Sequence, residues 1–307
     1  MKKALVTGAN GFVGTWICKE LTSNNVEVYA VIKDENENVE NIVNLPGLNI
    51  VYCQLSEIPD LPEKIAARDI DVFYHLAWVG SAGSLRGDYN VQLENVTYTC
   101  DAVKACHAIN CPRFVFSSSI MEHECAKAMQ TTIPVGRGNI YSVAKIAANY
   151  MAKILSFDLD IEYISAVISN IYGPGETSPR LINTTIRKML NGEKTSFTAG
   201  TQMYDFIYAS DAAKAFYKVG LSGKSNKSYY IGSLFPRPLK DFLMEIHNCM
   251  DVRHELGLGE IPFEGISLAY DEFDIYELRE DTGFIPEMDF TQGIIQTANW
   301  IRENEMV

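Results

Sequence analysis

The chain has 307 residues, 47% of them apolar, which is enough to bury a core in one large domain or two fused ones. Its 39 acidic and 26 basic side chains give a net charge of −13, so nucleic acid and anionic membrane surfaces are not expected partners. Residues 1–30 lack a signal-peptide layout, and no run of 18 apolar residues occurs. Seven cysteines without a CxxC pair favour reduced thiols in a cytoplasmic protein, and no metal site is expected.

The first predicted element is a short buried strand that runs into a glycine-rich turn. Apolar residues 4–6 predict the strand, and residues 12–21 show helical periodicity. The turn between them reads TGANGFVG, in which Gly8 permits a tight turn, Gly11 lets the backbone approach a ligand and Gly14 lets the helix pack on the strand. This arrangement predicts a phosphate group at the helix N-terminus, although a merely tight loop can carry the same glycines.

Further apolar runs alternate with helical stretches along the first half of the chain. The runs lie at 26–32, 48–53, 70–75, 113–117 and 161–168, and long amphipathic helices are expected at 89–108 and 140–156. Such alternation predicts an α/β protein with a Rossmann-type, doubly wound parallel sheet. The acidic stretch 34–40 is expected to be a solvated loop.

The end of the second strand bears on the choice of cofactor. An acid there binds the ribose 2′-hydroxyl of NAD, whereas a cation meets the 2′-phosphate of NADP. Lys33 lies nearest the strand end and Asp34 follows, so both cofactors remain open, with a slight preference for NADP. A solvent-exposed Lys–Asp pair without a ligand is the other interpretation.

A candidate acid/base pair opens the helix at 140–156. Tyr141 and Lys145 are four residues apart and therefore lie on one helix face. An ammonium close to a phenol is expected to lower the pKa of the tyrosine, which would suit it to move a proton at a hydroxyl group. Three serines, 117–119, end the strand before this helix and lie at the carboxyl edge of the sheet, where ligands of open α/β sheets bind.

Six motifs resemble, in order, those of the extended short-chain dehydrogenase/reductase family of nucleotide-sugar epimerases, dehydratases and reductases. They are Thr7-Gly-x-x-Gly-x-x-Gly14, His75-Leu76-Ala77, Asn95-Val96, Phe116-Ser-Ser-Ser119, Tyr141-x-x-x-Lys145 and Asn170-Ile-Tyr-Gly-Pro-Gly175. Segments 204–216, 228–243 and 278–294 resemble the family's later strands, its substrate-domain helix and its carboxyl-terminal signature. The resemblance therefore covers nearly the whole chain.

The resemblance implies a role for each matching residue. Tyr141 is the acid/base, Lys145 tunes it and holds the nicotinamide ribose, and Ser119, with Ser118 as the alternative, bonds the reacting oxygen. Ser117 is expected to lie against the cofactor. The remaining residues assigned to NAD or NADP are Gly8, Asn10, Gly11, Phe12, Val13, Gly14, Lys33, Asp34, Leu55, Leu76, Ala77, Asn95 and Ile168.

The resemblance also implies two interleaved domains. A dinucleotide-binding domain would comprise 1–170 with 201–232, and a substrate-binding domain 171–200 with 233–307. Their cleft would take a nucleoside diphosphate sugar, with contacts from Ser119, Asn170, Arg180 and Tyr204. The helices at 89–108 and 140–156 would form the seam of a homodimer.

Two departures from the family pattern bear on the reaction. Tyr204 takes the place of a common diphosphate-binding arginine, and this feature resembles a subgroup of deoxysugar 4-ketoreductases. Ile120 and Met121 follow the serines where dehydratases have an Asp–Glu pair, so the acid and base of dehydration are missing. Residues 122–124 (Glu-His-Glu) could reach a substrate but are expected to form an exposed turn.

Three catalytic functions follow from these patterns. Reduction of a 4-keto nucleotide sugar is favoured over C4 epimerisation with tightly bound NAD, and a reductase of a non-nucleotide hydroxy or keto compound is the second alternative. A cofactor-binding sensor that has lost its chemistry is disfavoured, because such a protein is expected to lack one of Ser119, Tyr141 and Lys145.

Overall fold

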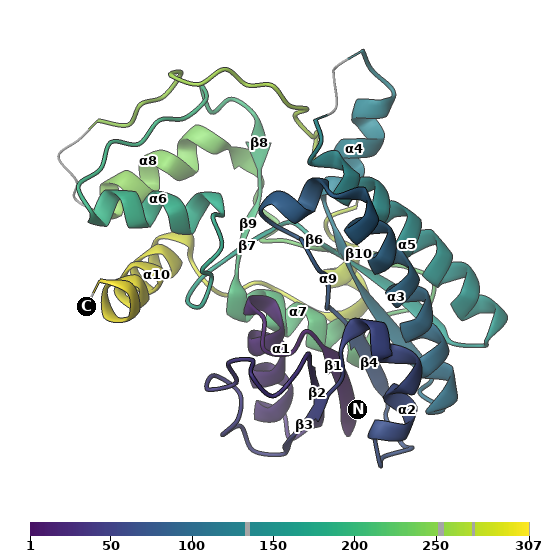
Figure 1. Ribbon diagram of the computed structural model, residues 1–307. Helices are drawn as coiled ribbons and strands as arrows, with labels where there is room; N and C mark the ends of the chain where they lie inside the picture. Colours follow the sequence, from purple (N-terminus) through teal and green to yellow (C-terminus); the bar gives the residue numbers. More distant parts are fainter. Residues whose placement is uncertain (133–135, 251–254, 272–273, 307) are drawn as a thin grey trace.

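The computed structural model describes residues 1–132, 136–250, 255–271 and 274–306 (Figure 1). Within these residues seven parallel strands form one sheet in the order β10-β6-β5-β4-β1-β2-β3. The order runs outward in both directions from β1 and β4, so the predicted doubly wound, Rossmann-type sheet is confirmed. The strands are β1 (Lys3–Thr7), β2 (Glu27–Ile32), β3 (Leu48–Tyr52), β4 (Val72–His75), β5 (Arg113–Ser119), β6 (Glu162–Ile168) and β10 (Ser228–Ile231).

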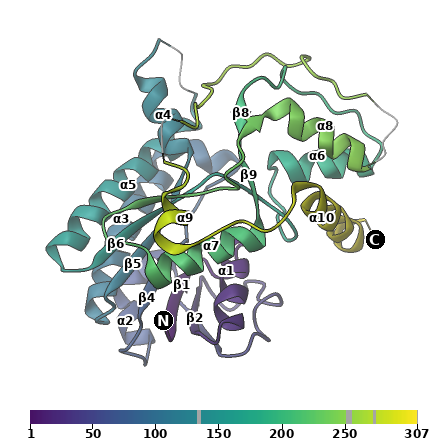
Figure 2. The same ribbon diagram turned by 180° about the vertical axis from the view of Figure 1, so that it is seen from behind.

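Helices cover both faces of this sheet, which explains why its strands read as continuous apolar runs (Figures 1 and 2). One face carries α1 (Phe12–Ser23), α7 (Ala209–Ser222) and α9 (Glu277–Thr282). The other carries η1 (Leu55–Asp60), α2 (Leu61–Lys64), α3 (Tyr89–Ala108) and α5 (Asn139–Asp158), so both long helices predicted from the sequence are present. Short η2 (Ser84–Gly87) precedes α3, and α4 (Met121–Met129) follows β5.

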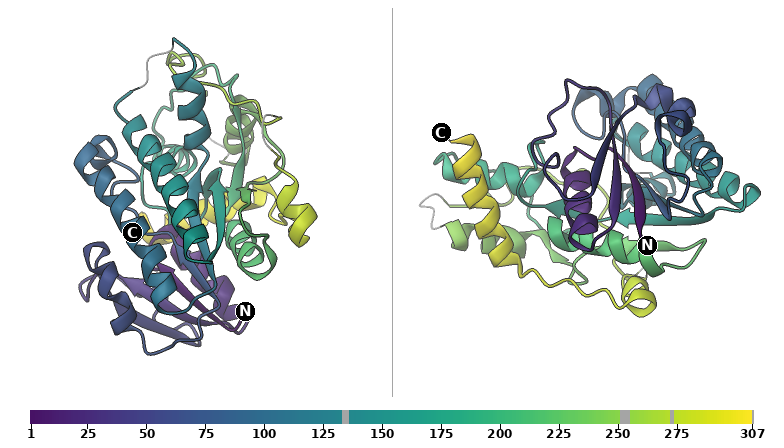
Figure 3. Two further views of the ribbon diagram at one scale, coloured as in Figure 1. Left: turned by 90° about the vertical axis from the view of Figure 1, so that its right-hand side faces the viewer. Right: turned by 90° about the horizontal axis from the view of Figure 1, so that it is seen from below.

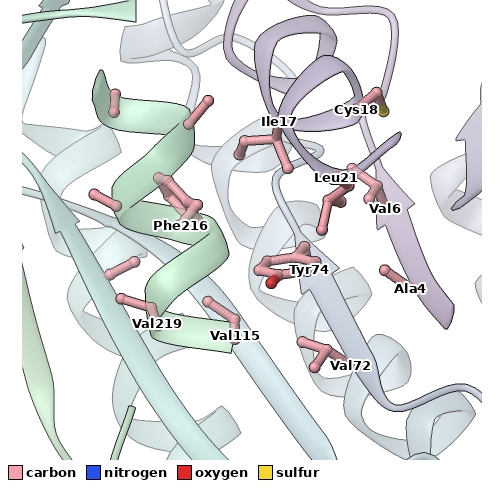
Figure 4. Packing of buried hydrophobic residues seen from close by; sticks show 14 of the residues in the cluster. Ala4, Val6, Ile17, Cys18, Leu21, Val72, Tyr74, Val115, Phe216 and Val219 are labelled. Atoms are coloured by element: carbon pink, nitrogen blue, oxygen red, sulfur yellow. The ribbon is translucent and has the colours of Figure 1, made fainter. Parts of the chain in front are cut away.

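The packing of α1 and α7 holds the glycine turn in place. Figure 4 shows Ile17 and Leu21 of α1 facing Phe216 and Val219 of α7 over the strands, with the ring of Tyr74 between them. All five side chains are fully buried. Burial of this size contributes about 1.5–3 kcal/mol per large apolar side chain, which fixes the start of α1 relative to the sheet edge.

A second core lies beside the carboxyl edge of the large sheet. It packs the aromatic rings of Phe206, Phe242 and Phe290 together, with centroids 4.9 to 6.3 Å apart. Its helices are α6 (Leu181–Leu190), α8 (Leu239–Met250) and α10 (Phe290–Glu305), and α10 is drawn in yellow at the C-terminal end of the chain (Figure 3). Two small sheets join it: β7 (Asn170–Tyr172) with β9 (Phe206–Tyr208), and β8 (Met203–Tyr204) with β11 (Arg237–Pro238).

Two segments lie elsewhere than their family resemblance suggested. Residues 203–208 form β8 and β9 of the small sheets and add no strand to the large one. Helix α9, which belongs to the carboxyl-terminal segment, packs against α7 and β10, and its Leu278 enters the core of the large sheet. The chain therefore crosses between the two cores at both segments.

Candidate active site

The glycine turn lies where the strand order reverses, between β1 and β4. Gly8 has φ +68, and a Cβ there would lie 2.9 Å from the backbone nitrogen of Ala77. A Cβ on Gly14 would overlap the carbonyl oxygen of Gly8. Gly11 is the N-cap of α1 and no side chain caps this helix, so the first N–H groups of α1, including those of Phe12 and Val13, face the turn unopposed by a side chain. This backbone cradle fits the pyrophosphate of a dinucleotide.

A cavity of about 320 Å³ extends from this turn along the ends of β2 and β3. Of the residues predicted to bind the cofactor, six line it: Gly8, Asn10, Gly11, Lys33, Leu55 and Ala77. Trp78, Glu94 and Tyr98 also line it, although the sequence analysis did not single them out. An apolar slot bounded by a few polar groups suits an adenosine group.

The charges around Lys33 do not favour a 2′-phosphate. Its Nζ lies 3.8 Å from a carboxylate oxygen of Asp34 and 3.9 Å from one of Glu37, and 64% of its side chain is exposed. Asp34 itself accepts a hydrogen bond from the backbone of Asn36 at 2.9 Å. A phosphate that reached Lys33 would also meet two carboxylates, so the slight preference for NADP gains no support.

Asn95 and Leu76 support the cavity wall. The amide of Asn95 is buried and both accepts from and donates to the backbone of Val79 at 2.9 Å, which holds the loop after β4. The N–H groups of Leu76 and Ala77 donate to Thr7 Oγ1 at 3.2 and 3.3 Å, and these bonds tie the end of β4 to the end of β1. Sequence reasoning did not assign the hydroxyl of Thr7 this role.

The predicted catalytic residues come together at the end of β5. Tyr141 and Lys145 are both buried on α5, and the phenol of Tyr141 is hydrogen-bonded to Ser119. Lys145 Nζ donates to the carbonyl oxygen of Ser117 at 2.7 Å and lies 3.9 Å from the ring centroid of Trp78. Ile168 pairs with Ser119 across β5 and β6. The serine end of β5 therefore places a hydroxyl, a phenol and an amine at one point of the sheet edge.

The direction of one pKa shift differs from the expectation. Burial raises the pKa of Tyr141 above its ordinary value of 10.0, and the hydrogen bond from Ser119 and the charges of Arg86 and Arg180 oppose this rise. Burial also lowers the pKa of Lys145 to about 7. The expected net lowering of the pKa of Tyr141 is therefore not found, because burial of the phenol outweighs the interactions that favour its ionised form.

Arg86 is a site residue that the sequence analysis missed. Its guanidinium carbon lies 4.4 Å from the ring centroid of Tyr141. The side chain is fixed there by bonds from Nε to the carbonyl of Gly138 at 3.3 Å and from one terminal nitrogen to the carbonyl of Ser81 at 3.0 Å. Arg86 lies in the short η2, more than fifty residues before Tyr141, so no spacing pattern could indicate the pair.

The segment after the serines is a helix and not the exposed turn that was expected. Glu122 lies in the first turn of α4 with 8% of its surface exposed, and its Oε1 accepts from Ser118 Oγ at 2.5 Å. The side chain of His123 is exposed at the surface, and partial desolvation lowers its pKa. Burial raises the pKa of Glu124 to about 7. The helix forms because Ile120 packs into a buried cluster with Tyr230 and Leu268, which turns the chain back over β5.

The predicted substrate contacts lie on the side of the second core. Asn170 Nδ2 donates to the carbonyl of Asp205 at 3.1 Å, so this amide braces β7 against β9. Arg180 lies immediately before α6, 2.8 Å from a Glu176 carboxylate, and its charge acts on Tyr141 across the cleft. Tyr204 stacks on Phe206 with ring centroids 5.5 Å apart. Arg180 is therefore a cation on the side of the second core whose charge acts on Tyr141.

A comparison with protein families gives a match over residues 4–232, to the model described as the NAD dependent epimerase/dehydratase family. The match covers most of the chain and includes the glycine turn and the Ser–Tyr–Lys group. The chain belongs to this family. As a family member it is an NAD-dependent enzyme of the extended short-chain dehydrogenase/reductase type, which confirms the resemblance noted from its motifs.

Three known proteins are similar to this family member over almost the whole of both chains. A putative UDP-glucose 4-epimerase of Methanocaldococcus jannaschii is 28% identical and covers 98% of both chains. The UDP-N-acetylglucosamine 4-epimerase of Methanobrevibacter ruminantium, solved with UDP-N-acetylmuramic acid, has a TM-score of 0.81 and 23% identity over 98% of both chains. The Bordetella bronchiseptica enzyme WbmF, solved with NAD+, has a TM-score of 0.80 and 21% identity over 99% of this chain and 93% of its own. The structural likenesses support the fold.

Proposed function

We propose that this family member is an NAD-dependent nucleotide-sugar C4 epimerase. The observation that carries the proposal is the buried group of Ser119, Tyr141 and Lys145 beside the glycine turn. Such a group can take a proton from a sugar hydroxyl and return it, next to a crevice that suits a dinucleotide. When bound, NAD accepts and donates the hydride.

Each residue of the group has a separate task in this proposal. Tyr141 Oη takes the proton of the sugar 4-hydroxyl, and Ser119 Oγ holds the same sugar oxygen. Ser119 Oγ accepts from the N–H of Met121 at 3.2 Å, which leaves its own proton to be donated to Tyr141 or to the sugar oxygen. Lys145 holds the nicotinamide ribose, and Arg180 with Asn170 lies on the side that would receive the nucleoside diphosphate.

Three observations favour epimerisation over the other reactions of the family. A relative that matches over 98% of both chains is described as a putative UDP-glucose 4-epimerase. The carboxylates of Asp34 and Glu37 beside Lys33 favour NAD, which an epimerase retains through its cycle. The chain lacks the Asp–Glu pair that supplies the acid and base of dehydration, since Ile120 and Met121 occupy those two positions.

The test is a single assay with matched controls. Purified protein is incubated with UDP-glucose or UDP-N-acetylglucosamine, and formation of the C4 epimer is followed by chromatography. We expect interconversion without added cofactor, release of NAD on denaturation, and no product with Tyr141→Phe. A protein that converts neither sugar and releases no nucleotide would contradict the proposal.

Reduction of a 4-keto nucleotide sugar is the second candidate. The observation that favours it is Tyr204, which stacks on Phe206 where family members commonly have an arginine. A reductase exchanges its cofactor at every turnover, so the purified protein would contain no nucleotide and would oxidise added NADH or NADPH with a 4-keto sugar. The state of the cofactor after purification therefore separates the two candidates.

We also propose that the enzyme is a cytoplasmic homodimer with the two interleaved domains predicted from the sequence. Exposed apolar side chains follow the α3 and α5 face, among them Leu93, Val143 and Ile154 at 59, 46 and 62% exposure. All seven cysteines are free thiols, as expected in a reducing compartment. No helix in the described part of the chain is long and apolar enough to cross a bilayer. Light scattering of the wild type and of Val143→Glu is expected to give dimer and monomer masses, respectively.

A further inference from the structure

A buried carboxylate lies directly behind the serine end of β5. Glu122 Oε1 accepts from Ser118 Oγ at 2.5 Å and from the backbone N–H of Ser119 at 3.1 Å, and its Oε2 accepts from Asn149 Nδ2 at 2.9 Å. The amide oxygen of Asn149 in turn accepts from the hydroxyl of Tyr163 at 2.7 Å. Three hydrogen-bond donors therefore surround the carboxylate of Glu122, a residue of which only 8% is exposed, and they compensate the cost of burying it.

No cation within the described residues forms an ion pair with Glu122 at contact distance. Its charge acts instead on Lys145: burial disfavours the ammonium form of Lys145, and the carboxylate of Glu122 opposes this effect. Of the other groups around the pair, His75 from β4 interacts with Lys145, and Glu122 also acts on His123 of α4, Tyr141 of α5 and Tyr163 of β6. Arg86 from η2 and Arg180 from the residue before α6 act on Tyr141. His75 is buried, with its pKa lowered to about 3, and the two arginines are cations. Glu122 is therefore the anion that this site provides for Lys145.

We propose that Glu122 is a positioning residue of the proposed acid/base site, where it fixes the backbone of Ser119 and places a negative charge next to helix α5 that favours the ammonium form of Lys145. The inference rests on the proposed roles of Ser119, Tyr141 and Lys145. It follows from geometry because one carboxylate touches the serine segment on one side and Asn149, one turn of α5 beyond Lys145, on the other. Helix α4 thus links strand β5 and helix α5 through a charge.

The first experiment needs no substrate. Protein labelled with 13C at lysine Cε is titrated by NMR with and without NAD, and the Lys145 signal is assigned by its absence in Lys145→Met. In Glu122→Gln, which keeps the shape but removes the charge, we expect the midpoint of Lys145 to fall by about one pH unit. The matched control is Tyr163→Phe, which removes a hydrogen bond from the same network and leaves the charge, so its midpoint is expected to match the wild type.

The second experiment measures epimerisation of UDP-glucose against pH. Glu122→Gln is expected to lower kcat about 10- to 100-fold with KM changed less than about threefold, and to move the alkaline limit of activity to lower pH. Glu122→Asp, which keeps the charge with a shorter reach, is expected to keep the wild-type pH limit at reduced kcat. If Glu122→Gln does not fold, Glu122→Ala, which removes the charge without leaving a buried amide, is titrated in its place. The same fall of the Lys145 midpoint is expected, and an unchanged midpoint overturns the proposal.

The outcomes separate this inference from the proposed function. An unchanged Lys145 midpoint in Glu122→Gln, or an equal shift in Tyr163→Phe, overturns the role of Glu122 whether or not any sugar is converted. A shifted midpoint in Glu122→Gln alone, in a protein that converts no nucleotide sugar, supports the charge role and contradicts the epimerase proposal.

Discussion

The ends of β1 and β5 lie on the same edge of one parallel sheet but are built in opposite ways. After β1 the chain removes side chains: Gly8 and Gly14 leave only backbone, and α1 begins without a cap. After β5 the chain instead brings side chains together, since Ser118 and Ser119 are hydrogen-bonded to Glu122 and lie next to residues from α5. A site for phosphate needs bare N–H groups, whereas a site for proton transfer needs several side chains held at short range.

The largest expected effect lies at the end of β5, where several side chains come together. Tyr141→Phe removes the hydroxyl that moves the proton and leaves the ring, which contacts Arg86 and Trp78. We expect turnover of UDP-glucose to fall by about 10²–10⁴-fold, with NAD affinity within about threefold of the wild type. Steady-state kinetics and calorimetric titration of NAD measure the two effects, and wild-type turnover would remove Tyr141 from the mechanism.

The glycine turn after β1 is tested by placing a methyl group at two of its glycines. Gly14→Ala is expected to lower the free energy of unfolding by about 1–3 kcal/mol, because its Cβ would overlap the carbonyl oxygen of Gly8. Gly11→Ala has its nearest contact at 3.3 Å and is expected to fold normally but to bind NAD at least tenfold more weakly, since the methyl group lies where the pyrophosphate approaches. Chemical denaturation and NAD titration of both variants separate packing from binding. Equal effects of the two changes on both measurements would contradict this distinction.

A smaller effect concerns the pH dependence of stability. The pKa of Lys145 is about 7 in the folded chain and near 10.5 when unfolded, so the unfolded chain binds more protons between these values. The contribution of Lys145 to the free energy of unfolding therefore rises with pH across this window. Lys145→Met is expected to be more stable than the wild type at pH 6, with the difference shrinking toward pH 10.

The matched control for that measurement is Lys153→Met on the same helix, where the lysine is partly exposed and donates to the carbonyl of Asn226. Its stability difference from the wild type is expected to stay constant with pH. Thermal melts of the three proteins from pH 6 to 10 measure both trends, and a parallel pH dependence of Lys145→Met and the wild type would contradict the burial of the amine.

The smallest effect lies at the far end of the cofactor cavity. Lys33→Ala removes a cation that two carboxylates already accompany. We expect the affinity for NADPH to fall less than tenfold and the affinity for NADH to fall still less. The reason is that a 2′-phosphate near Lys33 would also lie near the two carboxylates, which repel it. Fluorescence titration with both nucleotides measures the ratio. A larger loss for NADH would assign Lys33 to a different contact.

Much of the site could be predicted because its parts are local in sequence. A strand, three spaced glycines and a helix fix the phosphate cradle within twenty residues, and a four-residue spacing puts Tyr141 and Lys145 on one face of α5. The serines at the end of β5 follow from the same strand pattern. The helical state of Glu122–Glu124 could not be predicted, because it depends on where Ile120 finds a buried cluster.

By itself, then, the sequence determined the Rossmann-type sheet, the glycine turn and the Ser–Tyr–Lys group, because backbone conformation and side-chain spacing are set by near neighbours along the chain. Only the tertiary structure decided that Arg86 covers Tyr141, that Glu122 is buried behind Ser118 and that the pKa of Tyr141 rises. These features depend on burial and on charges brought together from distant segments. Electrostatic energies follow distance and exposure in space, and neither quantity is encoded in local spacing.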